Sequence, residues 1–574
     1  MININLVKTV AENEYLPGLM SNTANHNYAL DLVRSLVSII DDAVLIETIA
    51  ASALPEDYQG NTLDEISGMC EWALKNNKAE SKSKKDSFFD SLTSYLNKAG
   101  IELIHSEEDI GCFKVPNENG GFDTFPIKSR RGKLLIRKII YDEFGGSIGG
   151  NDLSDLIGSL EAIAIFDGPQ ETFHLRLAKI DKEIILDLGN PERSVVKCNA
   201  DGWEIIPSGM VDAIFRRREG YKSLSKAKRN GCLRKLRELL GITDDQIWYC
   251  IIAFIINALR PDGPYCCLIL DGEQGSGKSF LSAAIKRIID PNLLDKMRFP
   301  KSERDLMIQA KQYHLLVFDN ASGMKQHMSD ALCVLATGGG FATRSLRTDE
   351  DLMTFVVCRP FIINGIGGFA YNPDLLERGI HVSLPTMNPE SRKTEQELNE
   401  AFEDILPEVL GVFMGGIVQA LRNLESTLTP KGLRMADAAR WIAAAEPAFD
   451  VPPGSLVEAL RRSQGDIMKR AALEETLGQG LIQVLNTCGG KFEGSTAELL
   501  SELDNNNFNK LKDPFFPSNP SQLSNKLGRL QPALRLAGII ITKLPRSNKS
   551  SLWRIEFDET EDYSDTSKSD KPKF

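Results

Sequence analysis

Eight consecutive residues have the composition and spacing of a phosphate-binding loop. They complete a G-x-x-x-x-G-K-[ST] pattern and read Gly272, Glu273, Gln274, Gly275, Ser276, Gly277, Lys278 and Ser279. An apolar run precedes them at 266–270, and a helical pattern follows at 280–289. A strand that enters a glycine-rich turn before a helix points backbone N–H groups inward, so phosphates can sit at the positive end of the helix. Lys278 would add a charge for the β- and γ-phosphates and Ser279 a hydroxyl ligand for Mg²⁺, which predicts ATP and Mg²⁺ as cofactors.

Three polar residues that follow or precede apolar strands are candidates for the rest of the site. Asp319 ends the apolar run 314–319 and would hold the water shell of Mg²⁺. Asn364 ends the apolar strand 361–364 and could orient the lytic water, or it could merely cap the strand end. Arg378 precedes another strand, where its guanidinium could reach the nucleotide of a neighbouring subunit. The alternative for Arg378 is an ordinary arginine on a surface helix.

The order of these blocks resembles the ATPase part of phage and plasmid primase-helicases, which are related to superfamily 3 helicases. The similarity covers about residues 200–445, and its blocks are the phosphate loop, the strand that ends in Asp319 and Asn320, and the segments 337–349, 359–365, 374–378 and 432–437. The resemblance implies an AAA+-like ATPase core that acts in the replication of a phage or integrated mobile element. It also implies a homo-oligomer, for which a hexameric ring is one option.

Two departures from the family pattern leave the function open between two classes. In such helicases, a basic hairpin between the acidic strand and the next apolar strand contacts single-stranded DNA in the ring channel; Arg344 and Arg347 match it, but the usual lysine is absent. Asn320 stands where many related ATPases have a glutamate that activates the attacking water. The leading prediction is an ATP-hydrolysing motor on DNA, a replicative helicase-like ATPase. The alternative is a nucleotide-switched DNA-binding or regulatory protein that does not unwind strands.

Length and composition place these motifs in an ordinary globular protein. A chain of 574 residues is too long for one core, so three or four domains are expected. The net charge of −12 confines any DNA contact to local patches. No secretory signal is evident at the start, and the ten cysteines have no metal-ligand spacing, which together predict a cytoplasmic protein with reduced thiols.

The expected fold class is α/β and multidomain, with a P-loop AAA+-like core between a helical and β-rich N-terminal half and a C-terminal winged helix. A polar stretch at 76–86 is expected to be a linker or exposed turn. Nothing before residue 200 has the metal constellation of a polymerase or primase, because a pair such as Asp152 and Asp155 is usually a solvated surface. The predicted regions are 1–110 (mainly helical), 111–209 (a small β-rich domain), 210–430 (the ATPase core with a basic lead-in), 431–512 (helical), 513–558 (winged helix) and 559–574 (a disordered tail).

Two basic segments outside the loop are candidates for DNA contact. Residues 210–238 carry ten Lys and Arg against three acids, which suits either a phosphate-backbone patch or a solvated, salt-bridged face. The pattern at 521–538 predicts an amphipathic helix, and two strands with a basic turn follow it, which is the layout of a winged helix. Such domains bind duplex DNA or serve as protein-interaction modules. The candidate DNA contacts here are Lys526, Arg529, Arg546 and Lys549.

Overall fold

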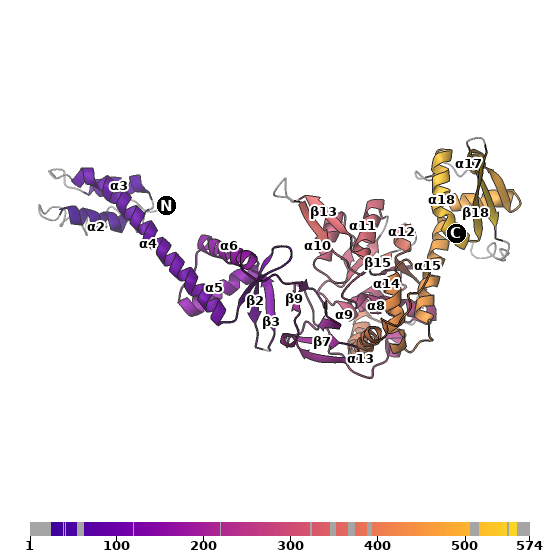
Figure 1. The fold of residues 1–574 in the computed structure, drawn as a ribbon, viewed down its shortest axis with the longest axis horizontal. Helices are drawn as coiled ribbons and strands as arrows, with labels where there is room; N and C mark the ends of the chain where they lie inside the picture. The colour runs from indigo at the N-terminus through magenta and orange to yellow at the C-terminus, as the bar shows by residue number, and fades with distance from the viewer. Residues whose placement is uncertain are drawn as a thin grey trace. The chain divides into compact units, whose positions relative to one another are not determined.

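The computed structural model describes most of the chain, which forms two units that we describe separately (Figure 1). The first unit comprises the described parts of Met1–His105, Asp109–Pro116 and Pro126–Pro169, and the second comprises Ser106–Glu108, Asn117–Phe125 and Gln170–Phe574. The described residues are 25–37, 40, 42–53, 62–118, 120–218, 220–321, 324–344, 352–365, 373–386, 393–505, 516–547 and 550–558.

The described part of the first unit begins with the helices α2 (Asn25–Val37), α3 (Ala43–Ser52) and α4 (Thr62–Lys98). Leu32, Ile46 and Ile66 belong to the hydrophobic cluster that holds them together. The backbone of α4 is helical throughout 76–86, so the linker or turn expected there was wrong. Its polar residues misled the prediction: the stretch contains no Gly or Pro, and Lys, Glu and Ala favour helix.

The first unit continues with the antiparallel strands β1 (Glu102–His105) and β2 (Gly111–Pro116), followed by α5 (Arg130–Phe144) and α6 (Gly150–Phe166). α5 begins after Ser129, whose side chain accepts the N–H of Gly132, and ends at Gly145, whose φ is 65°. These are ordinary N-terminal and C-terminal caps. Both helices lie within 111–209, where the sequence pattern indicated only strands.

An antiparallel sheet opens the main part of the second unit. Its order is β5-β6-β7-β8, so each strand pairs with the next one in the chain. The strands of this region are β3 (Phe122–Pro126), β4 (Phe173–His174), β5 (Leu177–Ile180), β6 (Glu183–Asp187), β7 (Ser194–Cys198), β8 (Trp203–Pro207) and β9 (Ile214–Phe215).

A five-stranded sheet with the order β11-β12-β15-β10-β16 forms the centre of the second unit, and every pair in it is parallel. The expectation of a mixed α/β, multidomain fold is confirmed. The strands are β10 (Cys267–Gly272), β11 (Met297–Arg298), β12 (Leu316–Ala321), β15 (Phe361–Gly365) and β16 (Gly379–Leu384), and a separate hairpin consists of β13 (Gly340–Arg344) and β14 (Leu352–Val356). The helices are α7 (Arg234–Leu239), α8 (Asp245–Ala258), α9 (Lys278–Ile289), α10 (Glu303–Ala310), α11 (Gln326–Thr337), α12 (Pro373–Leu376), α13 (Glu395–Asn423), α14 (Ala436–Ala445) and α15 (Ser455–Glu474).

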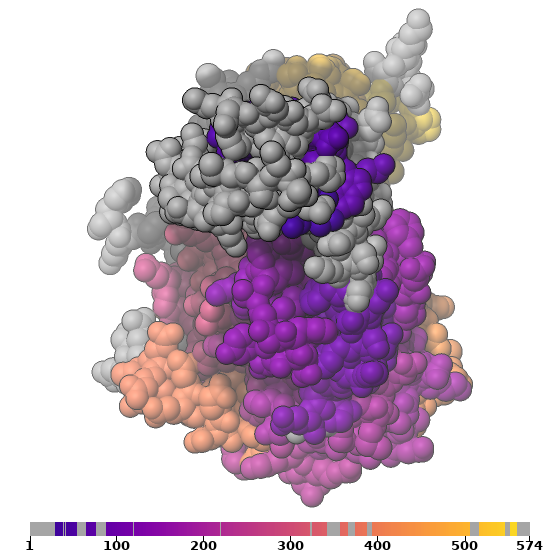
Figure 2. All heavy atoms as spheres, turned by 90° about the vertical axis from the view of Figure 1, so that its left-hand side faces the viewer, coloured from indigo at the N-terminus to yellow at the C-terminus, as the bar shows by residue number. Residues whose placement is uncertain are grey.

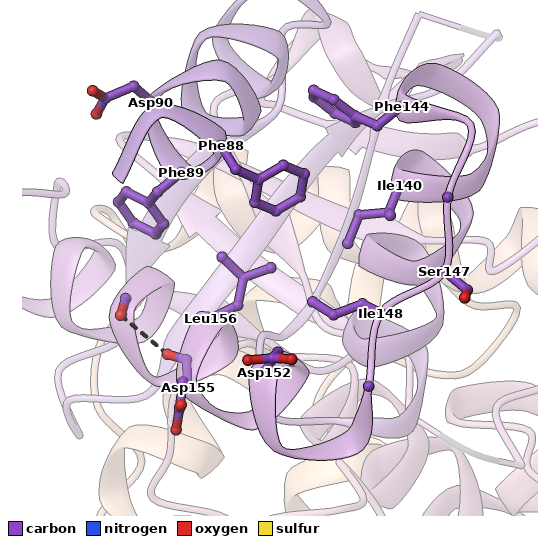
Figure 3. Close-up of a pocket in the computed structure, with 13 residues that line it drawn as sticks. Phe88, Phe89, Asp90, Ile140, Phe144, Ser147, Ile148, Asp152, Asp155 and Leu156 are labelled. Carbon is purple, nitrogen blue, oxygen red and sulfur yellow. Dashed lines mark hydrogen bonds between the residues drawn. The ribbon is translucent and has the colours of Figure 1, made fainter. Parts of the chain in front are cut away.

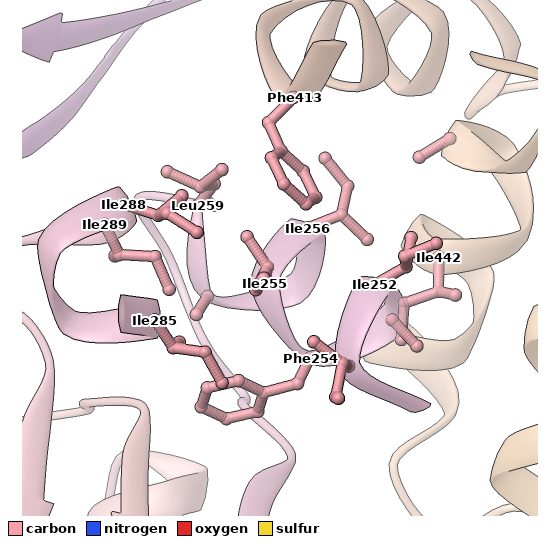
Figure 4. Close-up of a cluster of buried hydrophobic side chains, with 14 of the residues drawn as sticks. Ile252, Phe254, Ile255, Ile256, Leu259, Ile285, Ile288, Ile289, Phe413 and Ile442 are labelled. Carbon is pink, nitrogen blue, oxygen red and sulfur yellow. The ribbon is translucent and has the colours of Figure 1, made fainter. Parts of the chain in front are cut away.

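A large hydrophobic cluster fixes the position of α9 beside this sheet. Isoleucines of α8 and α9, such as Ile255 and Ile285, meet Phe413 of α13 and Ile442 of α14 (Figure 4). α8 is buried on nearly all sides, which explains its continuous apolar sequence. The cluster therefore holds the helix that follows the glycine-rich turn.

The C-terminal part of the second unit combines helices with a three-stranded antiparallel sheet of order β17-β19-β18. Leu523, Leu527, Leu530 and Leu534 are buried on one face of α18, as their spacing predicted. The elements are α16 (Thr476–Thr487), β17 (Lys491–Ser495), α17 (Thr496–Asn505), α18 (Pro520–Leu536), β18 (Ile539–Ser547) and β19 (Ser550–Phe557).

Among the described residues, one helix, α13, is long and apolar enough to span a bilayer. More than half of its most apolar window is buried inside the protein. Phe402, Phe413 and Ile417 of this helix are core side chains of the second unit. We therefore assign α13 to the hydrophobic core.

Candidate nucleotide site

The turn between β10 and α9 needs glycine at several positions. Gly275 and Gly277 have φ of 85° and 84°, which only glycine adopts without strain. Gly272 has φ of 149°, and a Cβ there would lie 2.6 Å from the carbonyl oxygen of Leu384 and 2.8 Å from Oγ of Ser276. The first N–H groups of α9 have no acceptor within the helix. They border the same turn, which gives it the character of an anion site.

The ammonium group of Lys278 lies inside this turn. Its Nζ donates to the carbonyl oxygens of Gly272 at 2.6 Å and Glu273 at 2.8 Å, and to Oγ of Ser276 at 3.3 Å. Glu273, Gln274 and Gly275 are exposed at the tip of the turn. The cation is therefore held by neutral oxygens next to solvent, where an anion could compete for it.

Ser279 and Asp319 meet although forty positions separate them in the chain. The hydroxyl of Ser279 donates to Oδ1 of Asp319 at 3.2 Å. Ser279 lies at the start of α9, after the turn that follows β10, and Asp319 lies near the carboxyl end of β12. The two residues meet because parallel strands end at the same edge of a sheet. Lys296 lies 3.8 Å from Asp319 as a second neighbour. One hydroxyl and one carboxylate suit Mg²⁺, which keeps most of its waters when it binds to protein.

Asn364 lies in the site, and protein atoms already occupy both ends of its amide. Its Oδ1 accepts the backbone N–H of Asn320 at 2.8 Å, and its Nδ2 donates to Oγ of Ser282 at 3.1 Å. The side chain is 1% exposed. Asn320 has φ of 55°, in the left-handed region that asparagine tolerates. Asn364 therefore fixes the turn after Asp319, in addition to any role toward a ligand.

Arg378 is not brought to this edge of the sheet. It directly precedes β16, and its carbonyl oxygen accepts the N–H of Cys267 at the beginning of β10. The guanidinium pairs with Asp374 at 3.1 Å and its side chain is 12% exposed. Arg434 binds the same carboxylate at 3.1 Å. Any contact between Arg378 and a nucleotide would thus be made in another subunit and would require the Asp374 pair to open.

A cavity of about 260 Å³ borders the turn at Ser276 and was not foreseen. It lies between the α7–α8 connection and the end of β16. Its apolar lining includes Leu240, Ile242, Ile247, Leu384 and Pro385. No local motif marks these residues, because they come from segments about 140 positions apart.

A buried charge cluster anchors the far end of α9. The carboxylate of Asp290 pairs with Lys286 at 2.8 Å and with Arg176 of the preceding β-rich segment at 3.2 Å. It also accepts the backbone N–H groups of His314 and Leu315. Although burial opposes ionisation, Lys286 and Arg176 hold the pKa of Asp290 well below its usual range. Burial lowers the pKa of His314 to about 4, with Arg359 adding to the effect.

The predicted DNA contacts are described only in part. Arg344 ends β13 of the hairpin, and its side chain lies outside the described residues; Arg347 and Lys549 also lie outside them. Arg546 belongs to β18, but its side chain is not described. Two further candidates on α18 differ in setting. Arg529 is exposed, whereas Lys526 is half-buried and pairs with Glu475 at 2.7 Å.

Several cations of the basic segment 210–238 bind partners within the protein and so stabilise the fold. Arg217 makes a bidentate pair with Asp187, and Lys235 pairs with Glu408. Arg229 donates to the carbonyl oxygen of Trp203, and Arg237 to that of Ile242. These partners favour the salt-bridged alternative for this charge run.

A separate cavity of about 870 Å³ lies in the first unit between α4, α5 and α6 (Figure 3). Phe88 and Phe144 meet edge to face there, with centroids 5.2 Å apart. Leu156 contributes to its apolar wall, and Asp152 and Asp155 lie exposed at its side. Among the described residues, no group of three or more His, Cys, Asp and Glu could hold a metal ion.

Comparison with known proteins relates this chain to replication proteins. Residues 233–468 match the family described as "Actinomycete integrative conjugative element replication protein", and residues 477–569 match the "AICE RepA C-terminal domain". The first match contains the glycine-rich turn, Asp319, Asn364 and Arg378. No curated protein matches the chain.

Among solved structures, three of the NrS-1 C-terminal region match loosely. Their identities are 12%, 12% and 13% and their TM-scores 0.39, 0.35 and 0.33. They cover 81%, 80% and 81% of this chain and 98%, 97% and 98% of their own. The assignment rests instead on the two family matches, which follow each other along the chain. Over residues 233–468 and 477–569 the chain is similar to replication proteins of integrative conjugative elements, and it is a replication protein of a mobile element.

Proposed function

We propose that this replication protein binds ATP with Mg²⁺ at the turn 272–279 and hydrolyses it to drive work on DNA. The observation that carries the proposal is the convergence of Lys278, Ser279 and Asp319 at one edge of the parallel sheet, with Ser279 and Asp319 in hydrogen-bond contact at 3.2 Å. A phosphate chain would replace the carbonyl oxygens that now hold Lys278. The turn's N–H groups would bind its other oxygens.

The residues present suit a magnesium nucleotide. Ser279 and Asp319 would hold the ion, which when bound neutralises charge on the phosphates. The cavity beside Ser276 is placed to bind the base of the nucleotide, since the apolar side chains of Leu240, Ile247 and Pro385 line it. Asn364 would keep Asp319 and the following turn in position through its bond to Asn320.

DNA would be contacted at two places. The hairpin of β13 and β14 carries Arg344 and stands between β12 and β15 in the chain, where a single strand could be gripped in an oligomer. The order helix, strand, two helices and two strands from α16 to β19 supports a winged helix that docks α18 on duplex DNA. Arg529 and Arg535 are exposed on that helix. Work on element DNA also places the protein in the cytoplasm.

The alternative is a slow nucleotide switch that does not unwind DNA. Asn320 favours it, because an amide stands at the position where many related ATPases have the glutamate that activates the attacking water. Glu273 lies within the turn itself, and its carboxylate accepts a hydrogen bond from the hydroxyl of Thr386 at 3.1 Å. It is the candidate base if hydrolysis is fast.

A binding titration with a fluorescent ATP analogue and Mg²⁺ tests the proposal. Lys278→Ala should weaken binding by about 10- to 100-fold, because a charge-assisted contact to phosphate is lost. Lys301→Ala, an exposed lysine outside the turn, is the matched control and should bind like the wild type. Equal affinity in the two variants would refute the site.

A further inference from the structure

Helix α5 of the first unit carries its charges in the reverse of the favourable order. Its first nine residues contain Arg130, Arg131, Lys133, Arg137 and Lys138, and no acid lies in its first turn. Its two acids, Asp142 and Glu143, come at its end. Cations near the positive end of a helix oppose its macrodipole. In a protein with a net charge of −12, this end is a concentrated positive region.

Three of the five cations of α5 have partners inside the protein, Arg131 among them. Lys138 pairs with Asp142 at 2.7 Å, and Arg137 donates to the carbonyl oxygen of Ile148 at 3.4 Å. For Arg130 and Lys133 no ion pair is found within the described part of the chain. Two cations near the start of a helix that have no ion pair among the described residues are a reason to look for an external ligand.

These cations share one solvent-facing side of the helix with apolar groups. Arg130, Leu134, Arg137 and Tyr141 follow the spacing of one helix face, along about 16 Å of helix. Tyr141 is 73% exposed and Leu134 is 54% exposed. The opposite side, with Ile136 and Ile139, is buried. Packing of α5 therefore does not require the exposed row.

The exposed row of α5 is separate from the cavity that lies next to this helix, because other residues of α5 line the cavity. Ile140 and Phe144 of α5 point into that cavity, together with Phe88 of α4 (Figure 3). The space-filling view shows the purple segment that contains α5 and α6 at the surface of the first unit (Figure 2). The charged side chains that line the cavity are carboxylates, including Asp152 and Asp155, so it is not continuous in charge with the basic row.

We propose that the exposed face of α5 is a binding site for single-stranded DNA. Arg130, Lys133 and Arg137 would hold backbone phosphates, and the ring of Tyr141 would stack on a base. An exposed aromatic ring among cations fits a single strand better than a duplex, whose bases are already stacked. The site goes beyond the proposed function, because it needs neither the nucleotide turn nor α18.

The test measures binding of the full-length chain to a fluorescein-labelled thirty-nucleotide oligo-dT by anisotropy, without nucleotide and over a range of salt. Arg130→Ala/Lys133→Ala/Arg137→Ala should bind about tenfold more weakly. The slope of log affinity against log salt concentration should be smaller in magnitude by about 2, because each of three lost phosphate contacts contributes about 0.7 to the slope for a single strand. The control Lys179→Ala/Lys182→Ala/Lys431→Ala removes three other exposed cations and should bind like the wild type.

Tyr141 gives a second, uncharged variant. Tyr141→Ala should weaken oligo-dT binding by about fivefold or more, and Tyr141→Phe should restore it, because stacking needs the ring and not the hydroxyl. Binding of the ATP analogue should be unchanged in all α5 variants. A wrong assignment of the α5 face can therefore be told apart from a wrong assignment of the nucleotide site. Wild-type binding by the α5 triple variant, or equal losses in both triple variants, would overturn the proposal.

Discussion

At the scale of single residues, the edge of the parallel sheet is a chain of hydrogen bonds that starts at α9 and ends beyond Asp319. The carbonyl oxygen of Lys278 accepts the hydroxyl of Ser282, which accepts Nδ2 of Asn364. Oδ1 of Asn364 then accepts the N–H of Asn320. A change in the turn can therefore reach the acidic strand through two side chains, those of Ser282 and Asn364. This connection makes Asn364 a positioning residue in the proposed mechanism.

Asp319→Asn should retain nucleotide binding but lose Mg²⁺-dependent turnover, because an amide does not stabilise the ion as a carboxylate does. The measurement is phosphate release with and without Mg²⁺. Asn320→Glu is the informative companion variant, and we expect it to raise turnover if a missing base limits the rate. A lower rate in Asn320→Glu would assign water activation to another residue, with Glu273 the next to test. Turnover at the wild-type rate in Asp319→Asn would contradict the metal assignment.

At the scale of elements, α9 is fixed at both ends by different means. Its beginning is the glycine-rich turn, and its end is the buried cluster of Asp290, Lys286 and Arg176. His314 adjoins this cluster, 3% exposed, and its Nε2 lies 2.8 Å from the carbonyl oxygen of Ala258. Burial lowers its pKa from 6.5 to about 4, so the folded protein holds it neutral.

This histidine makes the free energy of unfolding depend on pH. The unfolded chain binds a proton at His314 below about pH 6.5 while the folded protein does not, so its contribution is present above pH 6.5 and is lost as the pH falls toward about 4. We expect about 2 kcal/mol of stability to be lost between pH 7 and pH 5 through this group. Denaturant unfolding of His314→Gln should show a correspondingly smaller loss, and the exposed control His327→Gln should behave like the wild type. Identical pH dependence in His314→Gln would contradict the account.

Local sequence patterns predicted the elements that carry the candidate site. The features that depend on packing between distant segments could not be predicted in this way. The turn 272–279 and the strands that contain Asp319 and Asn364 were predictable, because a glycine motif and apolar runs are local signals. The sequence did not reveal the cavity at Ser276, whose walls come from segments far apart, or the pairing of Arg378 with Asp374. The polar composition of 76–86 led to the prediction of a linker or turn, whereas this stretch is the middle of α4. α5 and α6 were missed because they share the segment 111–209 with several short strands, whose alternating pattern favours a β-rich region.

At the scale of the whole molecule, α15 joins the proposed nucleotide site to the C-terminal elements. Arg470 near its end binds Asp271, the residue before the glycine-rich turn, at 3.0 Å. The next residue after α15, Glu475, pairs with Lys526 of α18. Two ion pairs at the end of one helix thus connect the turn to the proposed DNA-binding helix. This gives a physical route by which DNA could affect nucleotide turnover.

An oligomer would complete the site if Arg378 acts on a neighbour's nucleotide. Arg378→Ala alone and Lys278→Ala alone should both be inactive, and mixing them should restore part of the phosphate release, because some interfaces then combine an intact turn with an intact arginine. The paired cation Arg434 offers a control, since Arg434→Ala leaves both groups in place. A strictly monomeric active enzyme, or a wild-type rate in Arg378→Ala, would remove this part of the proposal.

The most direct test of the central claim is ATP turnover by the purified full-length chain, with and without single-stranded DNA. The proposed motor predicts Mg²⁺-dependent phosphate release that single strands stimulate and that Lys278→Ala abolishes, followed by unwinding of a forked duplex. ATP binding with slow turnover that DNA does not change would favour the nucleotide switch. Absence of both ATP binding and turnover in a folded, DNA-binding preparation would contradict the account.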